Sequence, residues 1–269
     1  MDNKKVLFVS QEITPYLSES EISRISRYLP QGIQERGKEI RTFMPRYGSI
    51  NERRNQLHEV IRLSGMNLII DDTDHPLIIK VASIQAARMQ VYFIDNEDYF
   101  HRKHVVRDNR GNEFEDNDER AIFFARGVLE TVKKLRWMPD IVHCHGWMSA
   151  LLPVYLKQLY SDDPIFSDVK IIYSVYNNGF KKPFRDTFRG KILADGIDPD
   201  SMKEGSEANF FNISKLAIDF SDGIIIGSSE INGEVEKYIR SQKSPVLEHK
   251  DDEEYVDAYN EFYDNLLQQ

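Results

Sequence analysis

Near the start of the chain, the spacing of hydrophobic residues changes from a pattern typical of strands to one typical of helices, and then returns to the strand pattern. Residues 6–9 form a short apolar run with β-branched and aromatic side chains, and residues 39–44 alternate polar and apolar; both patterns are typical of strands. Between these two segments, the apolar residues that recur at helical spacing are Ile22, Ile25, Leu29 and Ile33. The pattern predicts a strand, a helix and a second strand, which together form a βαβ unit over residues 5–44.

The next part of the chain contains three extended segments, residues 60–70, 77–84 and 91–94, with no helical pattern between them. These segments predict a β-rich insertion. A helix is expected from residue 117, because Asp116 or Asn117 can cap it and acidic residues follow in its first turn.

The second half of the chain alternates strand and helix patterns. Strands are expected at residues 140–145, 170–175 and 223–227, and helices at residues 147–160 and 209–220. This alternation predicts an α/β fold built on a Rossmann-like parallel sheet. Ligands of such sheets bind beyond the carboxyl ends of the strands, so the candidate binding loops are those after Ser10, His145, Val175 and Gly227.

The end of the chain is expected to be a linker followed by a helix. Residues 1–240 are predicted to form one domain, residues 241–250 a linker, and residues 251–269 a C-terminal amphipathic helix. One face of that helix carries an aromatic stripe formed by Tyr255, Tyr259, Phe262, Tyr263 and Leu266. We expect this stripe to pack on the domain rather than to bind a separate partner.

Composition narrows the function classes. The chain has 269 residues, 41% of them hydrophobic, which is enough for a sizeable core. Forty-four Asp and Glu against 35 Lys and Arg give a net charge of −9, which repels phosphate backbones and anionic lipids. No apolar run reaches the roughly 20 residues of a membrane span, and the single cysteine, Cys144, excludes an intrachain disulfide. We expect no nucleic-acid partner, no membrane partner and a cytoplasmic location.

Two histidines separated by one residue, His143 and His145, end one predicted strand, and Trp147 follows them. Their side chains share one face of the strand, which leaves three interpretations open. A metal site needs another histidine and a carboxylate, and the remaining histidines show no spacing that completes one. The alternatives are a buried, hydrogen-bonded pair and a sugar or phosphate pocket walled by Trp147. We expect neither a metal nor a cofactor.

Three other polar features have plain structural interpretations. Asp116, Asp118 and Glu119 offer paired carboxylates for acid–base chemistry, but the same residues suit a helix start, which we favour. Asn177, after another predicted strand, fits an ordinary turn. Residues 181–191 are basic with interleaved phenylalanines and are expected to form a solvated loop.

Four segments of the sequence resemble the bacterial glycogen synthases and plant starch synthases. They are residues 5–16 (KVLFVSQEITPY), 44–47 (MPRY), 116–120 (DNDER) and 139–147 (PDIVHCHGW). The resemblance runs in matching order over roughly residues 4–230 and implies a GT-B glycosyltransferase with two Rossmann-like domains, of which this chain is similar to the N-terminal one. Such enzymes bind ADP-glucose or UDP-glucose between the domains and transfer glucose, with retention, to an α-1,4-glucan.

The resemblance also implies which residues contact the sugar. The candidates for glucan or sugar binding are His143, His145, Trp147, Asn177 and Asp116. No residue is assigned a catalytic role.

At several positions the sequence departs from the motifs of the resembled family. These positions are Ser18, Ser20, Glu21, Arg24, Gly146 and Tyr176. The family's Lys-x-Gly-Gly-Leu loop, whose lysine and glycine backbone serve the phosphates and the sugar, reads Ser-Glu-Ser-Glu-Ile here. Loss of the cation and of the glycine backbone freedom, together with two added carboxylates, disfavours binding of a diphosphate.

The resemblance implies a second domain that holds most nucleotide contacts, and this chain has no counterpart of it. The sequence therefore predicts a glycogen or starch synthase-like domain without transfer activity of its own. The alternative is a non-catalytic glucan-binding or regulatory protein, whose partner is an α-glucan or maltodextrin, a full-length synthase or another protein.

Overall fold

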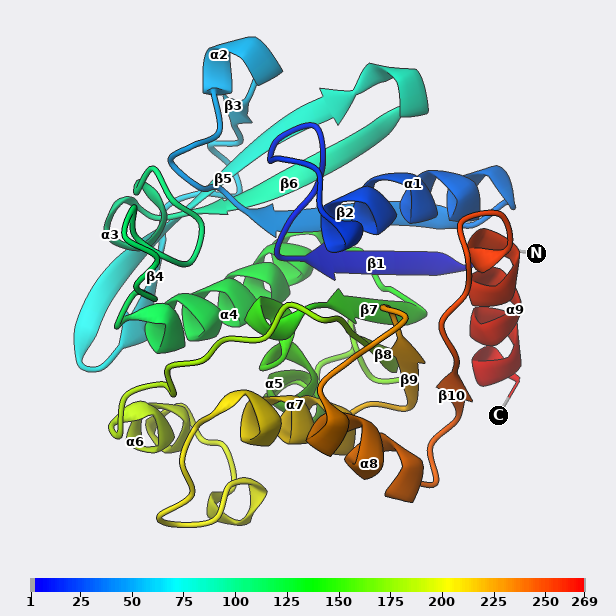
Figure 1. The fold of residues 1–269 in the computed structure, drawn as a ribbon. Coiled ribbons are helices and arrows are strands. Elements are labelled where there is room, and N and C mark those ends of the chain that lie inside the picture. The colour runs from blue at the N-terminus through cyan, green and yellow to red at the C-terminus, as the bar shows by residue number, and fades with distance from the viewer. Residues whose placement is uncertain (1–2, 269) are drawn as a thin grey trace.

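The computed structural model describes residues 3–268, which form a ten-stranded mixed sheet with helices on both faces (Figure 1). The strands are β1 (Lys5–Ser10), β2 (Glu39–Pro45), β3 (His58–Glu59), β4 (Met66–Ile70), β5 (Thr73–Ile84), β6 (Met89–Asp95), β7 (Ile141–His145), β8 (Lys170–Val175), β9 (Gly223–Ile226) and β10 (Val246–Leu247). The helices are α1 (Glu21–Glu35), α2 (Glu52–Asn55), α3 (Glu97–Phe100), α4 (Asn117–Leu135), α5 (Leu152–Leu159), α6 (Phe188–Ala194), α7 (Phe210–Asp219), α8 (Gly233–Ser241) and α9 (Tyr255–Leu267). Short 3-10 turns are η1 (Gln85–Ala87), η2 (Trp147–Ser149) and η3 (Pro199–Ser201). Among the helices of residues 3–268, none combines the length and hydrophobicity that a bilayer-spanning helix needs.

The central strands of the sheet are parallel. The order is β10-β9-β8-β7-β1-β2-β6-β5-β3, with β4 paired to β5 outside this path. Every neighbouring pair from β10 to β6 is parallel, whereas β5 pairs antiparallel with β6, β3 and β4. The predicted α/β fold with a Rossmann-like parallel sheet is confirmed.

Residues 91–94 and residues 147–160 are among the predicted segments that differ from the structure. Residues 91–94, expected in the β-rich insertion, belong to β6, which pairs in parallel with β2 inside the main sheet. Their alternating pattern identifies a strand but carries no information about its neighbours. Residues 147–160, expected as one helix, form η2 and α5. The helix restarts at Leu152 because Pro153 has no N–H to donate to an earlier turn and instead suits the first turn of a new helix.

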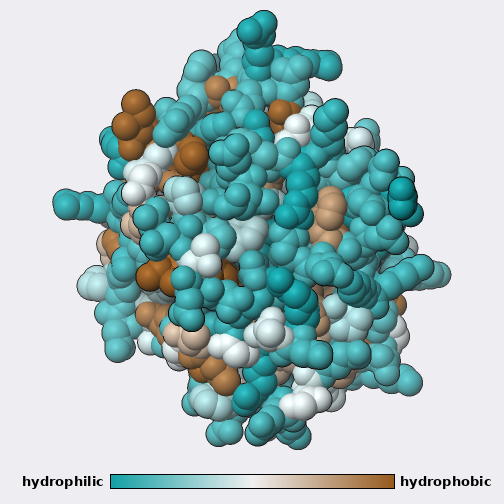
Figure 2. All heavy atoms as spheres, turned by 90° about the vertical axis from the view of Figure 1, so that its left-hand side faces the viewer, coloured by the Kyte–Doolittle hydropathy of each residue, from teal (hydrophilic) through white to brown (hydrophobic). Residues whose placement is uncertain are grey.

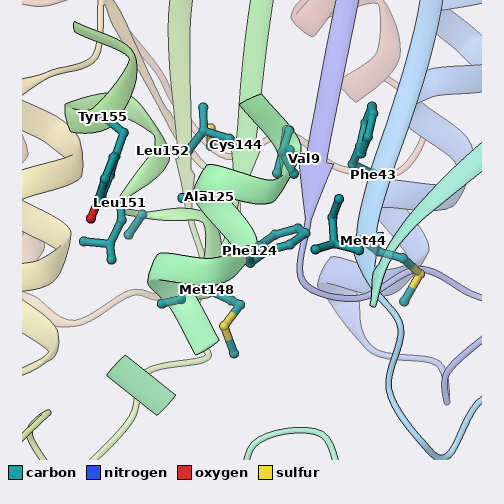
Figure 3. Close-up of a cluster of buried hydrophobic side chains, with 14 of the residues drawn as sticks. Val9, Phe43, Met44, Phe124, Ala125, Cys144, Met148, Leu151, Leu152 and Tyr155 are labelled. Carbon is teal, nitrogen blue, oxygen red and sulfur yellow. The ribbon is translucent and has the colours of Figure 1, made fainter. Parts of the chain in front are cut away.

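Alternation along each central strand sends side chains into two separate cores. From β1, Leu7 and Val9 point to the side covered by α4, α5 and α7, whereas Val6 and Phe8 point toward α1 and α9. All four are at most 1% exposed. Figure 3 shows Phe124 and Ala125 of α4 and Val9 of β1 among the buried side chains of the first core. Burial of one such side chain stabilises the fold by about 1.5–3 kcal/mol. Because β1 is packed in this way on both faces, the position of its carboxyl end is fixed by the two cores.

α9 packs beside α1 on the second face of the sheet. The residues of its aromatic stripe that are buried there are Tyr259, Tyr263 and Leu266. A Cβ on Gly32 of α1 would lie only 2.5 Å from Val256 Cγ1, so glycine permits this close approach. Lys38, just after α1, pairs with Asp264 of α9 at 2.7 Å. Residues 241–250, expected to be a linker, include β10, which extends the sheet by pairing with β9.

Candidate functional site

The carboxyl ends of the central parallel strands meet at one edge of the molecule. β1 points toward the left of Figure 1, so the loop after it lies on the side that faces the viewer in Figure 2. That side, the carboxyl-edge face, is mostly hydrophilic, with hydrophobic residues in separate small groups. Residues just beyond strands β1, β7, β8 and β9 include Gln11, Gly146, Asn177 and Ser228. Ligands of open α/β sheets bind at this edge.

Residues 18–21 stand in place of the resembled family's phosphate loop, and they close the N-terminus of α1 with their own side chains. Ser20 Oγ accepts from the Ser23 N–H at 3.1 Å, and Ser23 Oγ accepts from the Ser20 N–H at 2.8 Å. This capping box satisfies backbone amides that an anion would otherwise bind. Ser20 Oγ also donates to the Glu12 carboxylate at 2.8 Å, and the Glu21 carboxylate accepts from Ser228 Oγ. Two carboxylates therefore lie beside this helix N-terminus.

Arg24, which replaces an acidic residue of the resembled family, is used for attachment of the C-terminal segment. Its guanidinium pairs with Asp252, just before α9. Further along α1, Arg36 pairs with Asp257 of α9 at 2.6 Å. Arg24 thus connects α1 with the segment that precedes α9.

His143 and His145 lie side by side, fully buried. Their ring centroids are 3.8 Å apart, as expected for residues on one face of β7. The two ring nitrogens of His143 each lie 2.6 Å from a hydroxyl, on Tyr263 and on Ser174, and His145 Nδ1 lies 2.7 Å from the Tyr176 hydroxyl. Burial lowers the pKa of His145 to about 3 and holds the pKa of His143 well below its usual value, so both imidazoles are neutral near pH 7.

Trp147 and Asn177 have different surroundings. The Trp147 ring is 2% exposed and packs on Phe180 and Phe184, with ring centroids 5.0 and 5.9 Å apart. Asn177 is exposed, and its backbone N–H donates to Ser228 Oγ at 2.9 Å. Of these two candidates, Asn177 alone reaches solvent.

The expected open sugar pocket around His143, His145 and Trp147 is not present, because none of the three is more than 2% exposed. Aromatic side chains from α9 and from the loop after β8 cover them. The interpretation as a buried, hydrogen-bonded histidine pair fits the structure instead.

Gly146 stands where the resembled family has an aspartate, and its backbone adopts a conformation that favours glycine. Its φ is +79°, and a Cβ would lie 2.6 Å from Gln11 Oε1 and 2.7 Å from Ile22 Cδ1. The Asn178 amide nitrogen would be 3.0 Å away. Glycine is therefore favoured both by the backbone conformation and by the lack of space.

Three polar atoms at the end of β7 and in the loop after β8 are buried without a hydrogen-bond partner. They are Nε2 of His145 and both amide atoms, Nδ2 and Oδ1, of Asn178. An unsatisfied buried polar group costs about 1–3 kcal/mol. Of the two residues, His145 is fully buried and Asn178 is half-buried, so only Asn178 lies near the surface. The sequence did not single out Asn178, because an asparagine in a turn has the same local pattern whether its amide is solvated or enclosed. Gln11 was not singled out either, because it follows a strand without any periodic pattern of its own. Within residues 3–268, no three His, Cys, Asp or Glu side chains are grouped as metal ligands.

Asp116 lies apart from these residues, at the start of α4. It is the N-cap residue, but its side chain makes no capping hydrogen bond. Its Oδ1 instead accepts from Arg102 Nη1 at 2.6 Å. Asp116 is thus the N-cap residue of a helix that starts at Asn117, as predicted, but its carboxylate binds a nearby guanidinium instead of the helix amides.

Asp118 and Glu119 are held in ion pairs and are not available for acid–base chemistry. Asp118 pairs with Arg185 at 2.7 Å, and Lys191 lies 2.5 Å from Glu119. Lys191 is only 5% exposed and belongs to α6, so residues 181–191 are not simply the solvated loop that was expected. Ion pairs with Asp118 and Glu119 of α4 stabilise the buried position of the Lys191 ammonium group.

A cavity of about 650 Å³ lies between residues 107–115 and residues 181–182. Its charged lining residues are Arg107, Lys181 and Lys182 on the basic side and Asp108, Glu113 and Glu115 on the acidic side. The Glu113 carboxylate accepts from the backbone N–H groups of Lys181 and Lys182 at 3.0 and 2.7 Å, which joins the two segments. Because the opposite charges balance, the cavity favours a neutral polar ligand over a diphosphate.

Most of the chain is similar to glycogen and starch synthases. The family model of the starch synthase catalytic domain matches residues 5–247. The glycogen synthase of Chlorobium limicola is 42% identical over 211 residues, which are 77% of this chain and 42% of that protein. The glycogen synthase of Chlorobium phaeobacteroides is 39% identical over 176 residues, which are 65% of this chain and 36% of that protein.

A solved structure shows the same fold. The catalytic domain of starch synthase IV from Arabidopsis thaliana, bound to ADP and acarbose, superposes with a TM-score of 0.75 at 17% identity, over 92% of this chain and 51% of that one. This chain spans about two-fifths of the length of the curated relatives that it matches. The matched residues 5–247 contain every strand of the sheet. The chain therefore belongs to the starch synthase catalytic domain family, and its Rossmann-like domain is the N-terminal domain of the GT-B glycosyltransferase fold of glycogen and starch synthases.

Proposed function

We propose that this domain holds the end of an α-1,4-glucan at its carboxyl-edge face and does not by itself bind ADP-glucose or UDP-glucose or transfer their glucose. The family supplies the substrate class, and the residues of this chain decide which part of the reaction it retains. The observation that carries the proposal is the self-capped, acidic N-terminus of α1.

The donor side of the reaction is disfavoured by charge. Transfer from a nucleotide sugar leaves negative charge on a diphosphate, which an enzyme stabilises with preorganised donors. Ser20 already occupies one helix amide, and the carboxylates of Glu12 and Glu21 lie beside the others. A like charge about 4 Å away costs about 4 kcal/mol near a protein surface, which corresponds to a loss of about a thousandfold in affinity.

The acceptor side is supported by neutral polar groups. The unpaired amide of Asn178, a half-buried side chain beyond β8, matches the donor and acceptor character of sugar hydroxyls. The ion pairs of the neighbouring cavity add fixed donors and acceptors without a net charge. The Arabidopsis domain of the same fold is described with acarbose bound, which also supports a carbohydrate ligand.

A transfer assay tests the proposal. The purified chain is incubated with glycogen and with labelled ADP-glucose or UDP-glucose, next to a full-length glycogen synthase as positive control. We expect incorporation at the level of the protein-free blank. Elongation of glycogen by the chain alone would overturn the proposal.

Calorimetry with maltoheptaose tests the acceptor side. We expect saturable heat with the unmodified protein and about fivefold weaker binding for Asn178→Ala, since one hydrogen bond contributes about 1 kcal/mol. The matched control is Asn55→Ala in α2, an asparagine that is likewise half-buried, and this variant should bind as tightly as the unmodified protein. Equal binding by both variants would exclude Asn178 from the site.

A further inference from the structure

Arg120 is a buried arginine whose hydrogen-bond acceptors include no carboxylate. It lies in the first turn of α4 with 0% of its side chain exposed. Its Nε and Nη2 donate to the backbone carbonyls of Tyr99 and Val105 at 2.8 and 2.6 Å. Its Nη1 donates to Asn117 Oδ1 at 2.7 Å. All three nitrogens of the guanidinium therefore donate hydrogen bonds to neutral oxygen atoms.

Three aromatic rings surround the same guanidinium. Arg120 Cζ lies 5.8 Å from the ring centroid of Tyr47 and 5.3 Å from those of Phe100 and Phe114. Burial lowers the pKa of Arg120 to about 10, so the side chain still carries its charge near pH 7. Cation–π contacts offset only part of the several kcal/mol that burial of a charge costs. An apolar side chain would fill this place at lower cost, so the arginine has a role besides filling space.

The segment held by Arg120 has little regular structure of its own. Residues 101–116 contain no helix or strand, only a single β-bridge between Arg107 and Glu113. Asn117 also helps to fix this segment, because its Nδ2 donates to the Val106 carbonyl at 3.0 Å. Glu113 of the same segment joins residues 181–182, so its position also sets the width of the cavity there.

We propose that Arg120 is a positioning residue that fixes residues 101–116 against the sheet edge and keeps the adjoining cavity in the shape that binds a glucan. The ligand part of this proposal rests on the proposed function. The mechanical part, which is the order of residues 101–116, does not.

Hydrogen exchange and calorimetry on Arg120→Met test both parts. We expect backbone amides of residues 101–116 to exchange at least tenfold faster and the Kd for maltoheptaose to rise at least tenfold. The matched control is Arg126→Met on the same helix, since Arg126 bonds Asp195 and the Ile69 carbonyl instead of this segment. Arg126→Met should lower Tm while it leaves both readouts unchanged, which separates positioning from stability. Arg120→Lys, with fewer donors, should fall between the two.

Two results would overturn the proposal: unchanged exchange of residues 101–116 in folded Arg120→Met, or faster exchange with an unchanged Kd. If Arg120→Met does not fold, Arg120→Lys and Asn117→Ala replace it, with an expected threefold or larger increase in exchange; no increase in either would count against the proposal. If the unmodified protein binds no maltoheptaose, the proposed function fails, and the exchange result alone decides whether Arg120 positions the segment.

Discussion

Gly146, Ser20 and Glu21 occupy positions where the motifs of the resembled family have an aspartate and a glycine-rich loop with a lysine, and each of the three makes specific contacts in this structure. The space beside Gly146 is filled by Gln11 and by other side chains. Ser20 caps α1, and Glu21 accepts from Ser228. A substitution that restores a single residue of the family motif would therefore disrupt contacts that the neighbouring side chains now make.

Gly146→Asp, which restores the family residue, should destabilise the fold. The positive φ and the contacts that a Cβ would make with Gln11 and Ile22 each cost about 1–3 kcal/mol, so we expect the free energy of unfolding in urea to fall by about 2 kcal/mol or more. Gly190→Asp is the control, because a Cβ there meets open space. Equal stability of the two variants would contradict the close packing described around Gly146.

The buried histidines predict a pH dependence of stability. Histidines of the unfolded chain titrate near pH 6.5, whereas His143 and His145 stay neutral in the folded protein far below that. The unfolded state therefore binds more protons as pH falls, and the free energy of unfolding, fully present above about pH 6.5, decreases below it. The decrease approaches about 1.4 kcal/mol per pH unit for each histidine.

Urea unfolding at pH 7.5, 6.5, 5.5 and 5.0 measures this effect. Carboxylates with lowered pKa, such as Glu52 and Glu113, lose their contribution only below about pH 4.5. Burial raises the pKa of Asp195, which increases stability as pH falls, so a decrease in stability within this window is due to the histidines. The double variant His143→Asn, His145→Asn should show most of the slope removed. Constant stability of the unmodified protein from pH 7.5 to 5.0 would refute the neutral, buried assignment.

Among the secondary structure elements, those with a long apolar stripe could be predicted from the sequence. The stripe of α1 and the aromatic stripe of α9 both face the sheet, since each spans several turns of the helix. The two-residue strand β10 could not be predicted, because a strand of that length has no periodic pattern and exists only through its pairing with β9. The break between η2 and α5 follows from Pro153, a signal that was present and was not used.

Attachment of α9 depends on a hydroxyl as well as on apolar contact. Tyr263→Phe keeps the ring but leaves His143 Nδ1 buried without its partner, so we expect the free energy of unfolding to fall by about 1–3 kcal/mol. Tyr28→Phe on α1 is the control: this ring is 52% exposed, and the change should stay within about 0.5 kcal/mol. An equally small effect at Tyr263 would mean that the hydroxyl contributes nothing to the attachment of α9.

For the whole molecule, the parallel sheet and the meeting of the strand ends at one edge could be predicted, whereas the burial of the candidate site residues could not. Strand order fixes that the loops after β1, β7, β8 and β9 meet. The burial of His143 is decided by Tyr263, which lies 120 residues away in the chain, and no local pattern reports such a contact. The burial of Arg120 could not be predicted either, because two of its hydrogen-bond acceptors are backbone carbonyls, which every residue type has.

The central claim is that this domain has kept the hydroxyl-binding side of a glucosyltransferase and lost the diphosphate-binding side. Parallel calorimetric titrations of the same preparation with ADP-glucose and with maltoheptaose test it most directly. The account predicts saturable heat with maltoheptaose and none with ADP-glucose up to about 1 mM, a limit of about −4 kcal/mol in binding free energy. Stoichiometric capture of ADP-glucose at micromolar concentration would contradict it.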